Sequence, residues 1–328
     1  DRESAEYTCS DLYALLPGDN VFILPVSGKN IEKSNYKSTL GVQRTAALSR
    51  LMEKNQEFSV IVTYPEALEE GVPALKQIKS SVLSVRKGDE INYETLKELL
   101  AEKGFEKVDF VSAPGQYAIR GSIVDIFSYS DNHPYRLSFF GNEVEKIHVF
   151  DCNTQLSIET VDQADIYPDL VAGGSGEEGV SILTLLQKDT TVWLDSSDMY
   201  REESFFPSLV EFRHIFLDIP LLKQGVDSVA FSISPQPVFN KNFELLLSDI
   251  RSRIESNYKV YIYGEKESQL ERLRSIMLQD EHAVLPEFVK WKNIHAGFID
   301  HEDRVCCYSD HEIFDRFHRV RLRRTVEK

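Results

Sequence analysis

The sequence predicts a multidomain protein of mixed α/β and α+β class. A length of 328 residues is enough for two or three domains. Short apolar runs alternate with segments of helical spacing towards both ends of the chain, which is typical of α/β layers. Between them, residues 114–151 have the pattern of four strands in succession, which is typical of an antiparallel sheet in an α+β module.

Composition narrows the class of protein further. Apolar residues make up 42% of the chain and charged residues 27%, as is ordinary for a soluble globular protein. The net charge of −16 disfavours non-specific nucleic-acid binding by the chain as a whole. No apolar run approaches the roughly 20 residues of a membrane span, so we expect no membrane contact. Four cysteines without CxxC spacing favour a cytoplasmic location, with Cys306 and Cys307 in a buried strand.

The first part of the α/β domain, residues 1–82, alternates helices and strands. The expected elements are a helix at 1–16, a strand at 21–25, a helix at 39–53, a strand at 58–64 and a short helix at 66–70 that Pro65 opens. The chain begins inside a predicted helix and without an initiator methionine. We therefore expect a fragment of a longer protein.

Residues 27–30, SGKN, resemble the end of a phosphate-binding loop. Such a loop requires GxxxxGK[ST], because its backbone N–H groups surround phosphates and its hydroxyl group holds magnesium. Here Asn30 stands in place of the hydroxyl residue and Ile23 in place of the first glycine. A nucleotide-dependent helicase or nuclease that uses the 21–30 loop is thus the alternative function, and the spacing disfavours it.

The α+β module is expected at residues 83–168. It contains a strand near 81–85, an amphipathic helix at 92–103 closed by Gly104, a strand at 108–112, and then strands at 116–120, 122–129, 135–140 and 144–150. Gly141–Asn142 is short enough to join the last two strands as a hairpin.

The strand at 135–140 has one apolar and one mixed face. Because side chains alternate, Leu137 and Phe139 share the core face, and Arg136 and Phe140 share the other, about 13 Å apart. Arg120 could lie beside them. An exposed Arg–aromatic surface is typical of a protein-binding hot spot. The alternative is that Arg136 is an ordinary solvated residue and that a neighbouring domain buries Phe140.

The remaining chain is expected to complete the α/β domain (169–236) and to form a small α/β domain (237–328). The expected elements are a helix at 180–186, strands at 190–194 and 228–233, helices at 239–255 and 267–278, and strands at 259–263, 284–285 and 304–308. The glycine-rich stretch 172–176 fits a natural loop or an engineered linker. The basic helix at 311–324 either contacts nucleic acid or an acidic partner, or is a solvated connector.

We find no catalytic constellation in the sequence. HExxH, GxSxG and CxxC motifs are missing, and no pair of carboxylates stands out as a general acid and base. His311 and His318 are most simply surface residues of one helix face, and the charge run 300–303 is most simply a solvated turn. We therefore predict no catalytic residue, no metal site and no enzyme activity for this chain.

Three segments carry a family resemblance: 115–127, 134–144 and 150–155. They fit G-[EQ]-[FY]-x-[VIT]-R-G-[GSA]-[IL]-[VIL]-D-[VIL]-F, then P-[YV]-R-[ILV]-x-F-F-G-[DN]-E-[VI], then F-D-x-x-[TS]-Q. In these segments the chain resembles the bacterial transcription-repair coupling factors (Mfd) and, less closely, the excision-repair protein UvrB. Weaker agreement covers most of the chain in the same order.

The resemblance implies a fold and a role. The fold is a degenerate helicase-like α/β domain interrupted by a UvrA-binding α+β module and followed by a small α/β domain. The role is recruitment of UvrA to stalled RNA polymerase in transcription-coupled nucleotide excision repair, with Arg120, Arg136 and Phe140 as UvrA-binding residues. ATP and magnesium would bind only to motor domains outside this chain, which has no cofactor of its own. RNA polymerase and DNA would likewise contact other parts of the parent protein. Another possibility is that those parts cover the Arg–Phe face until the motor engages.

Overall fold

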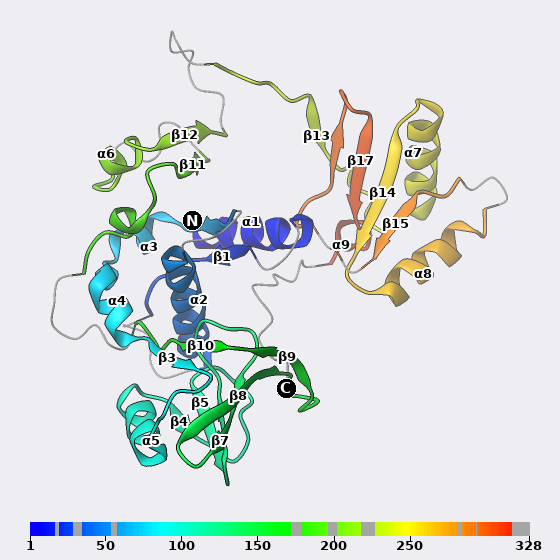
Figure 1. Ribbon diagram of the computed structural model, residues 1–328. Coiled ribbons are helices and arrows are strands. Elements are labelled where there is room, and N and C mark those ends of the chain that lie inside the picture. The colour runs from blue at the N-terminus through cyan, green and yellow to red at the C-terminus, as the bar shows by residue number, and fades with distance from the viewer. Residues whose placement is uncertain are drawn as a thin grey trace. The chain divides into compact units, whose positions relative to one another are not determined.

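The computed structural model describes residues 1–16, 20–28, 35–53, 58–171, 179–195, 202–217, 227–280, 284–290, 292 and 294–316. They form two compact units (Figure 1). The first is built chiefly from Phe22–Leu221, and the second from Glu6–Val21 with Leu222–Arg321. Helices and strands occur in both units, which confirms that the protein is of mixed α/β structure with several sheets.

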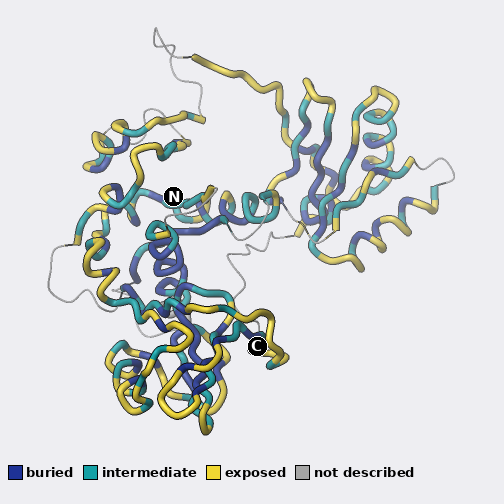
Figure 2. Tube along the Cα trace, viewed as in Figure 1, coloured by how far each residue is buried: buried dark blue, intermediate teal, exposed yellow. Residues whose placement is uncertain are grey.

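The alternation of helices and strands predicted for residues 1–82 is confirmed. The elements are α1 (Arg2–Leu15), β1 (Val21–Ile23), α2 (Asn35–Met52), β2 (Val60–Val62), α3 (Pro65–Glu69) and α4 (Leu75–Ser81). Pro65 opens α3 as expected, because its fixed φ suits the first helical turn. The sequence missed α4. Most of α2 from Leu40 onward is buried (Figure 2), since it lies in the core of this unit.

The segments on either side of the α+β module share one hydrophobic core. Leu24, Leu48 and Ile78 from the first segment pack with Leu170 and Leu194 from the second. The second segment contains a 3-10 turn, η1 (Ile182–Leu185), then β11 (Thr191–Leu194), α6 (Phe206–Leu209) and β12 (Arg213–Phe216), with β11 and β12 parallel. The chain thus leaves this core for the module and returns to it.

The two segments also meet through their backbones at a pair of glycines. Val72 and Val180 exchange two N–H···O bonds of 2.9 Å. At the preceding residues, a Cβ atom on Gly71 would lie 2.8 Å from the Cα atom of Gly179. Only residues without a side chain allow this approach.

The module is a six-stranded sheet with one long helix. The sheet order is β4 (Glu106–Lys107), β5 (Gln116–Arg120), β6 (Ile123–Ile126), β7 (Tyr135–Phe140), β8 (Glu143–Phe150) and β9 (Ser157–Val161). A separate antiparallel pair joins β3 (Leu83–Arg86) to β10 (Gln163–Ile166). The Gly141–Asn142 hairpin is confirmed, because Phe140 pairs with Glu143 across it.

Helix α5 (Tyr93–Glu102) covers the core face of this sheet. Its first turn is capped by Asn92, whose Oδ1 accepts the N–H groups of Glu94 and Thr95, and it ends before Gly104 at a φ of 81°. Leu96 and Leu100 on α5 pack with the sheet residues Val124, Leu137, Val144 and Ile147. The predicted strand at 108–112 is wrong: β4 ends at Lys107, and the next residues form a loop.

The second unit contains a five-stranded mixed sheet. Its order is β13 (Ile233–Pro235), β16 (Phe298–Asp300), β17 (Val305–Ser309), β14 (Lys259–Gly264) and β15 (Glu287–Lys290). Helices α7 (Phe243–Glu255) and α8 (Glu267–Met277) contribute Leu246, Ile250 and Leu270 to its core. Cys306 and Cys307 are buried in β17, as predicted.

Several expectations for this unit are wrong in position. The strand expected at 228–233 overlaps β13 only at Ile233, and the strand expected at 284–285 lies instead at β15. Helix α7 starts at Phe243 rather than 239, because Asn240 and Lys241 adopt positive φ values of 49° and 63°. Of the helix expected at 311–324, the described residues contain a single turn, α9 (Asp310–Ile313), and residues 314–316 are not helical. Residues 317–324, like Lys29, Asn30 and the stretch 172–178, lie outside the described residues.

Candidate protein-interaction site

Strand β7 presents the two faces that alternation predicted. Leu137 and Phe139 are buried, whereas Phe140 is 78% exposed. Arg136 and Phe140 therefore belong to the same face of the sheet, and Phe140 stands at its margin beside the hairpin turn. The elements of its own module leave the Phe140 ring uncovered.

A buried carboxylate lies at the centre of this face. Asp125 is opposite Arg136 in the β6–β7 register and is 1% exposed. Arg136 donates from Nε to Oδ1 (2.7 Å) and from Nη2 to Oδ2 (2.9 Å), a bidentate pair. Arg120 forms a second ion pair with the same carboxylate through Nη2. Two cations and one carboxylate leave one net positive charge here.

Arg136 is held from two further sides. Its guanidinium carbon lies 4.1 Å from the centroid of the Phe150 ring, and its Nη2 donates to Oε1 of Gln155 (2.9 Å). Gln155 adopts a positive φ of 60° in a turn where its own N–H donates to the carbonyl of Asp151 (2.7 Å). The hydrogen bond to Asp125 raises the pKa of Arg136, so the residue is a permanent cation.

Arg120 is held by an aromatic ring. Its guanidinium carbon lies 4.6 Å from the centroid of the Phe110 ring, and Phe110 is itself 62% exposed. Phe110 belongs to the loop that was predicted as a strand. In that loop Val108 and Val111 pack with Ala118 and Phe150. The loop therefore covers part of the sheet face that carries the arginines, and it adds an exposed ring to it.

The structure brings together two of the three predicted site residues and places the third on the same face. Arg120 and Arg136 meet at Asp125, and Phe140 is at the edge. The side chains of Arg120 and Arg136 are 33% and 21% exposed and are ion-paired with Asp125, a partner that the sequence analysis did not anticipate. The sequence analysis missed Asp125, Gln155 and Phe110. An aspartate within the apolar run IVDIF was a usable signal, since a buried charge requires a partner.

Two fixed arginines and an exposed aromatic ring characterise this face of the module. Over the described ranges, no three His, Cys, Asp or Glu side chains are grouped so that they could hold a metal ion. Among the helices that the structure describes, none has the length and hydropathy needed to cross a bilayer. An exposed aromatic ring beside fixed arginines is the composition of a protein-binding hot spot.

Comparison with known proteins agrees with this architecture. Residues 83–170 match the family described as the UvrB interaction domain. The six-stranded sheet and its arginine–aspartate network thus lie within the segment that is similar to the UvrB interaction domain.

The relatives give a more particular identification. The transcription-repair-coupling factor of Bacillus subtilis (strain 168) is 33% identical over 165 residues, which cover 50% of this chain and 14% of that protein. UvrABC system protein B of Streptococcus suis (strain 98HAH33) is 33% identical over 147 residues, 44% of this chain and 22% of that protein, and the same figures hold for Streptococcus pyogenes serotype M5 (strain Manfredo). The matches span less than a quarter of the length of these relatives. This chain carries a transcription-repair-coupling-factor (Mfd)/UvrB-like region.

Proposed function

We propose that the module at residues 83–168 binds UvrA, and that this chain is the N-terminal part of a transcription-repair coupling factor. One observation carries the proposal. Residues from all three segments of family resemblance, namely Arg120, Asp125, Arg136, Phe150 and Gln155, contact one another in a single network beside an exposed phenylalanine. A network of this kind fixes side chains that would otherwise be mobile, which lowers the entropic cost of binding a partner.

In this proposal Asp125 positions the two arginines and the partner completes the charge balance. The Asp125 and Gln155 contacts use Nε and Nη2 of Arg136, and the guanidinium group has further N–H donors on Nη1. With one net positive charge on the network, an acidic surface of UvrA is the expected complement. Phe140, and Phe110 next to Arg120, would supply apolar anchors.

The rest of the chain has a supporting role in the proposal. Residues 1–82 and 169–236 would form the degenerate helicase-like domain that the module interrupts, and 237–328 the small α/β domain. The common core of the two flanking segments supports this division. The chain would bring UvrA to stalled RNA polymerase without hydrolysing ATP, whereas contacts with polymerase and DNA would belong to other parts of the longer protein.

The test is the affinity of the 328-residue chain for purified UvrA. Arg136→Ala and Phe140→Ala should each weaken binding about 30-fold, equivalent to about 2 kcal/mol. Phe231→Ala is the matched control, because that ring is 71% exposed but lies outside the module. Unchanged affinity in both module variants, with wild-type circular dichroism, would refute the proposal.

A further inference from the structure

A buried cation lies behind the loop that follows β1. The Arg44 side chain on α2 is 3% exposed. It donates from Nη1 to the carbonyl of Pro25 (2.5 Å) and from Nη2 to the carbonyl of Gly71 (3.3 Å). Carbonyl groups do not neutralise a guanidinium group, and a buried charge requires a counterion. Within the described part of the chain, the ion pair recorded for Arg44 is with Glu70, at 3.7 Å between Nη1 and Oε2.

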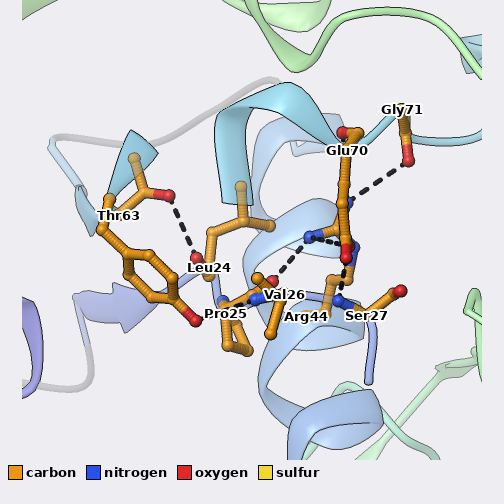
Figure 3. A network of polar contacts seen from close by, with 9 residues as sticks. Leu24, Pro25, Val26, Ser27, Arg44, Thr63, Glu70 and Gly71 are labelled. Atoms are coloured by element: carbon orange, nitrogen blue, oxygen red, sulfur yellow. Dashed lines mark hydrogen bonds and ion pairs between the residues drawn. The ribbon is translucent and has the colours of Figure 1, made fainter. Parts of the chain in front are cut away.

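The Glu70 carboxylate has a second partner in the loop itself. The backbone N–H of Ser27 donates to the same Oε2 atom at 2.5 Å. Figure 3 shows Glu70 reaching both the Arg44 guanidinium group and the Ser27 nitrogen. Ser27 is 6% exposed, so this N–H group depends on a protein partner rather than on bulk water.

We infer that Arg44 and the Ser27 N–H form an oxyanion-binding position, and that Glu70 is its intramolecular ligand. A guanidinium group and a backbone N–H in a loop between a strand and a helix are donors that bind carboxylate and phosphate oxygens alike. The position lies at Ser27, the first residue of the SGKN stretch that resembles the end of a phosphate-binding loop. Glu70 closes it with a negative charge of the chain, so a phosphate-bearing ligand is excluded.

This inference is independent of UvrA binding and concerns the alternative nucleotide-dependent function. A nucleotide phosphate at this loop would have to displace Glu70 from Arg44. Removing the Glu70 carboxylate should have two consequences. The buried cation loses its counterion, which destabilises the fold. The vacated donors then attract a small oxyanion from solution, and its binding restores stability through mass action.

The experiment compares the melting temperatures of the wild-type chain, Glu70→Ala and Glu69→Ala. Glu69 is the exposed neighbour in α3 and serves as the matched control. In sodium chloride, Glu70→Ala should melt about 4 °C or more below the wild type, and Glu69→Ala within about 1 °C of it. Inorganic phosphate at the same ionic strength should raise the melting temperature of Glu70→Ala alone. Equal shifts in all three proteins would overturn the inference.

A second measurement covers a variant that does not fold in chloride. Phosphate should then recover its far-ultraviolet circular dichroism, and failure to recover it counts against the inference. The ³¹P resonance of inorganic phosphate supplies a direct readout. It should broaden in the presence of Glu70→Ala and stay sharp with the wild type. Broadening by the wild type would mean that Glu70 does not close the position.

Discussion

Arg136 and Asp125 face each other across β6 and β7, and the guanidinium group of one makes two hydrogen bonds, of 2.7 and 2.9 Å, to the carboxylate of the other. Asp125 is buried and also pairs with Arg120. Asp125 is therefore inaccessible to a binding partner, but it orients Arg120 and Arg136, which are partly exposed and accessible. This relationship separates side chains that position the surface from side chains that form it.

Replacing Asp125 tests that separation. Asp125→Asn keeps the shape but removes the charge, which leaves two partly buried arginines without their counterion. We expect a loss of about 3–5 kcal/mol in the free energy of unfolding in urea. Asp109→Asn is the control on an exposed aspartate and should change stability by less than about 0.5 kcal/mol. A wild-type urea midpoint for Asp125→Asn would contradict the central role of this carboxylate.

Replacing Phe139 should lower folding stability, whereas replacing its neighbour Phe140 in β7 should lower the affinity for UvrA. Phe139 is 6% exposed and Phe140 78% exposed. Phe139→Ala should cost about 3–5 kcal/mol of folding stability. Phe140→Ala should leave stability within about 0.5 kcal/mol and lower UvrA affinity instead. Denaturation and binding measured on both variants check the pair, and a large stability loss in Phe140→Ala would contradict its exposure.

Phe110 and Arg120 should act together in binding. Because the ring holds the guanidinium group at 4.6 Å, removing either residue should disturb the other. In a double-mutant cycle with Phe110→Ala and Arg120→Ala, we expect a coupling of about 0.5–1 kcal/mol in UvrA affinity. Phe110 and Phe231 on separate units provide the comparison cycle, which should be additive. Additivity in the first cycle would show that Phe110 does not position Arg120.

The close approach of Gly71 and Gly179 gives a prediction for the interrupted domain. A methyl group at either position would lie 2.8 Å from backbone atoms of the other, so the two segments would have to separate. Gly71→Ala should lower the free energy of unfolding by about 1–3 kcal/mol. Glu69→Ala, two residues earlier and exposed, is the control. Equal stability of the two variants would mean that the contact adjusts without cost.

The second unit should lose stability as the pH falls below neutrality. The expectation that His311 is a surface residue is wrong, because its side chain is buried. Its Nε2 lies 2.9 Å from the carbonyl oxygen of His295, which can only accept, so Nε2 carries a proton. Burial lowers the pKa of His311 below its ordinary 6.5, although the carboxylates of Glu312 and Asp310 oppose the shift. Between 6.5 and the lower folded value, the unfolded chain binds a proton that the folded chain does not.

His311→Gln, which does not titrate, isolates this contribution. The urea midpoint of the wild type should fall more between pH 7 and pH 5 than that of the variant. The comparison uses the two pH slopes, because the substitution also changes packing. Parallel slopes would show that His311 does not contribute to the pH dependence.

Local patterns predicted much of the fold because most elements are regular. The faces of β7 followed from alternation alone, and Pro65, Asn92 and Gly104 mark helix ends by their backbone chemistry. Strand β8 shows the limit of such patterns. A register shift opposite Ser138 and Phe139 puts both Val144 and Ile147 in the core. These residues are three apart, so regular alternation of side chains would have placed them on opposite faces.

The sequence analysis identified Arg120 and Arg136 as site residues but did not predict the contacts between them and Asp125. The connection between β6 and β7 is too long to fix their register, so the pairing of Asp125 with Arg136 did not follow from the sequence. Likewise, Val108 and Val111 are apolar because they cover the second face of the sheet, not because they form a strand. The Asp125–Arg136 pairing and the burial of Val108 and Val111 both depend on tertiary contacts, which cannot be predicted from local periodicity.

The pairing of β3 with β10 bears on how such a module moves between proteins. Leu83 lies opposite Ile166, so the polypeptide enters and leaves the module on two adjacent antiparallel strands, about 5 Å apart. A host chain needs only a gap of that width to accept the module, and closing the gap after its removal costs little entropy. Transplantation of residues 83–168 into an unrelated surface loop, as one continuous cassette, is therefore geometrically simple.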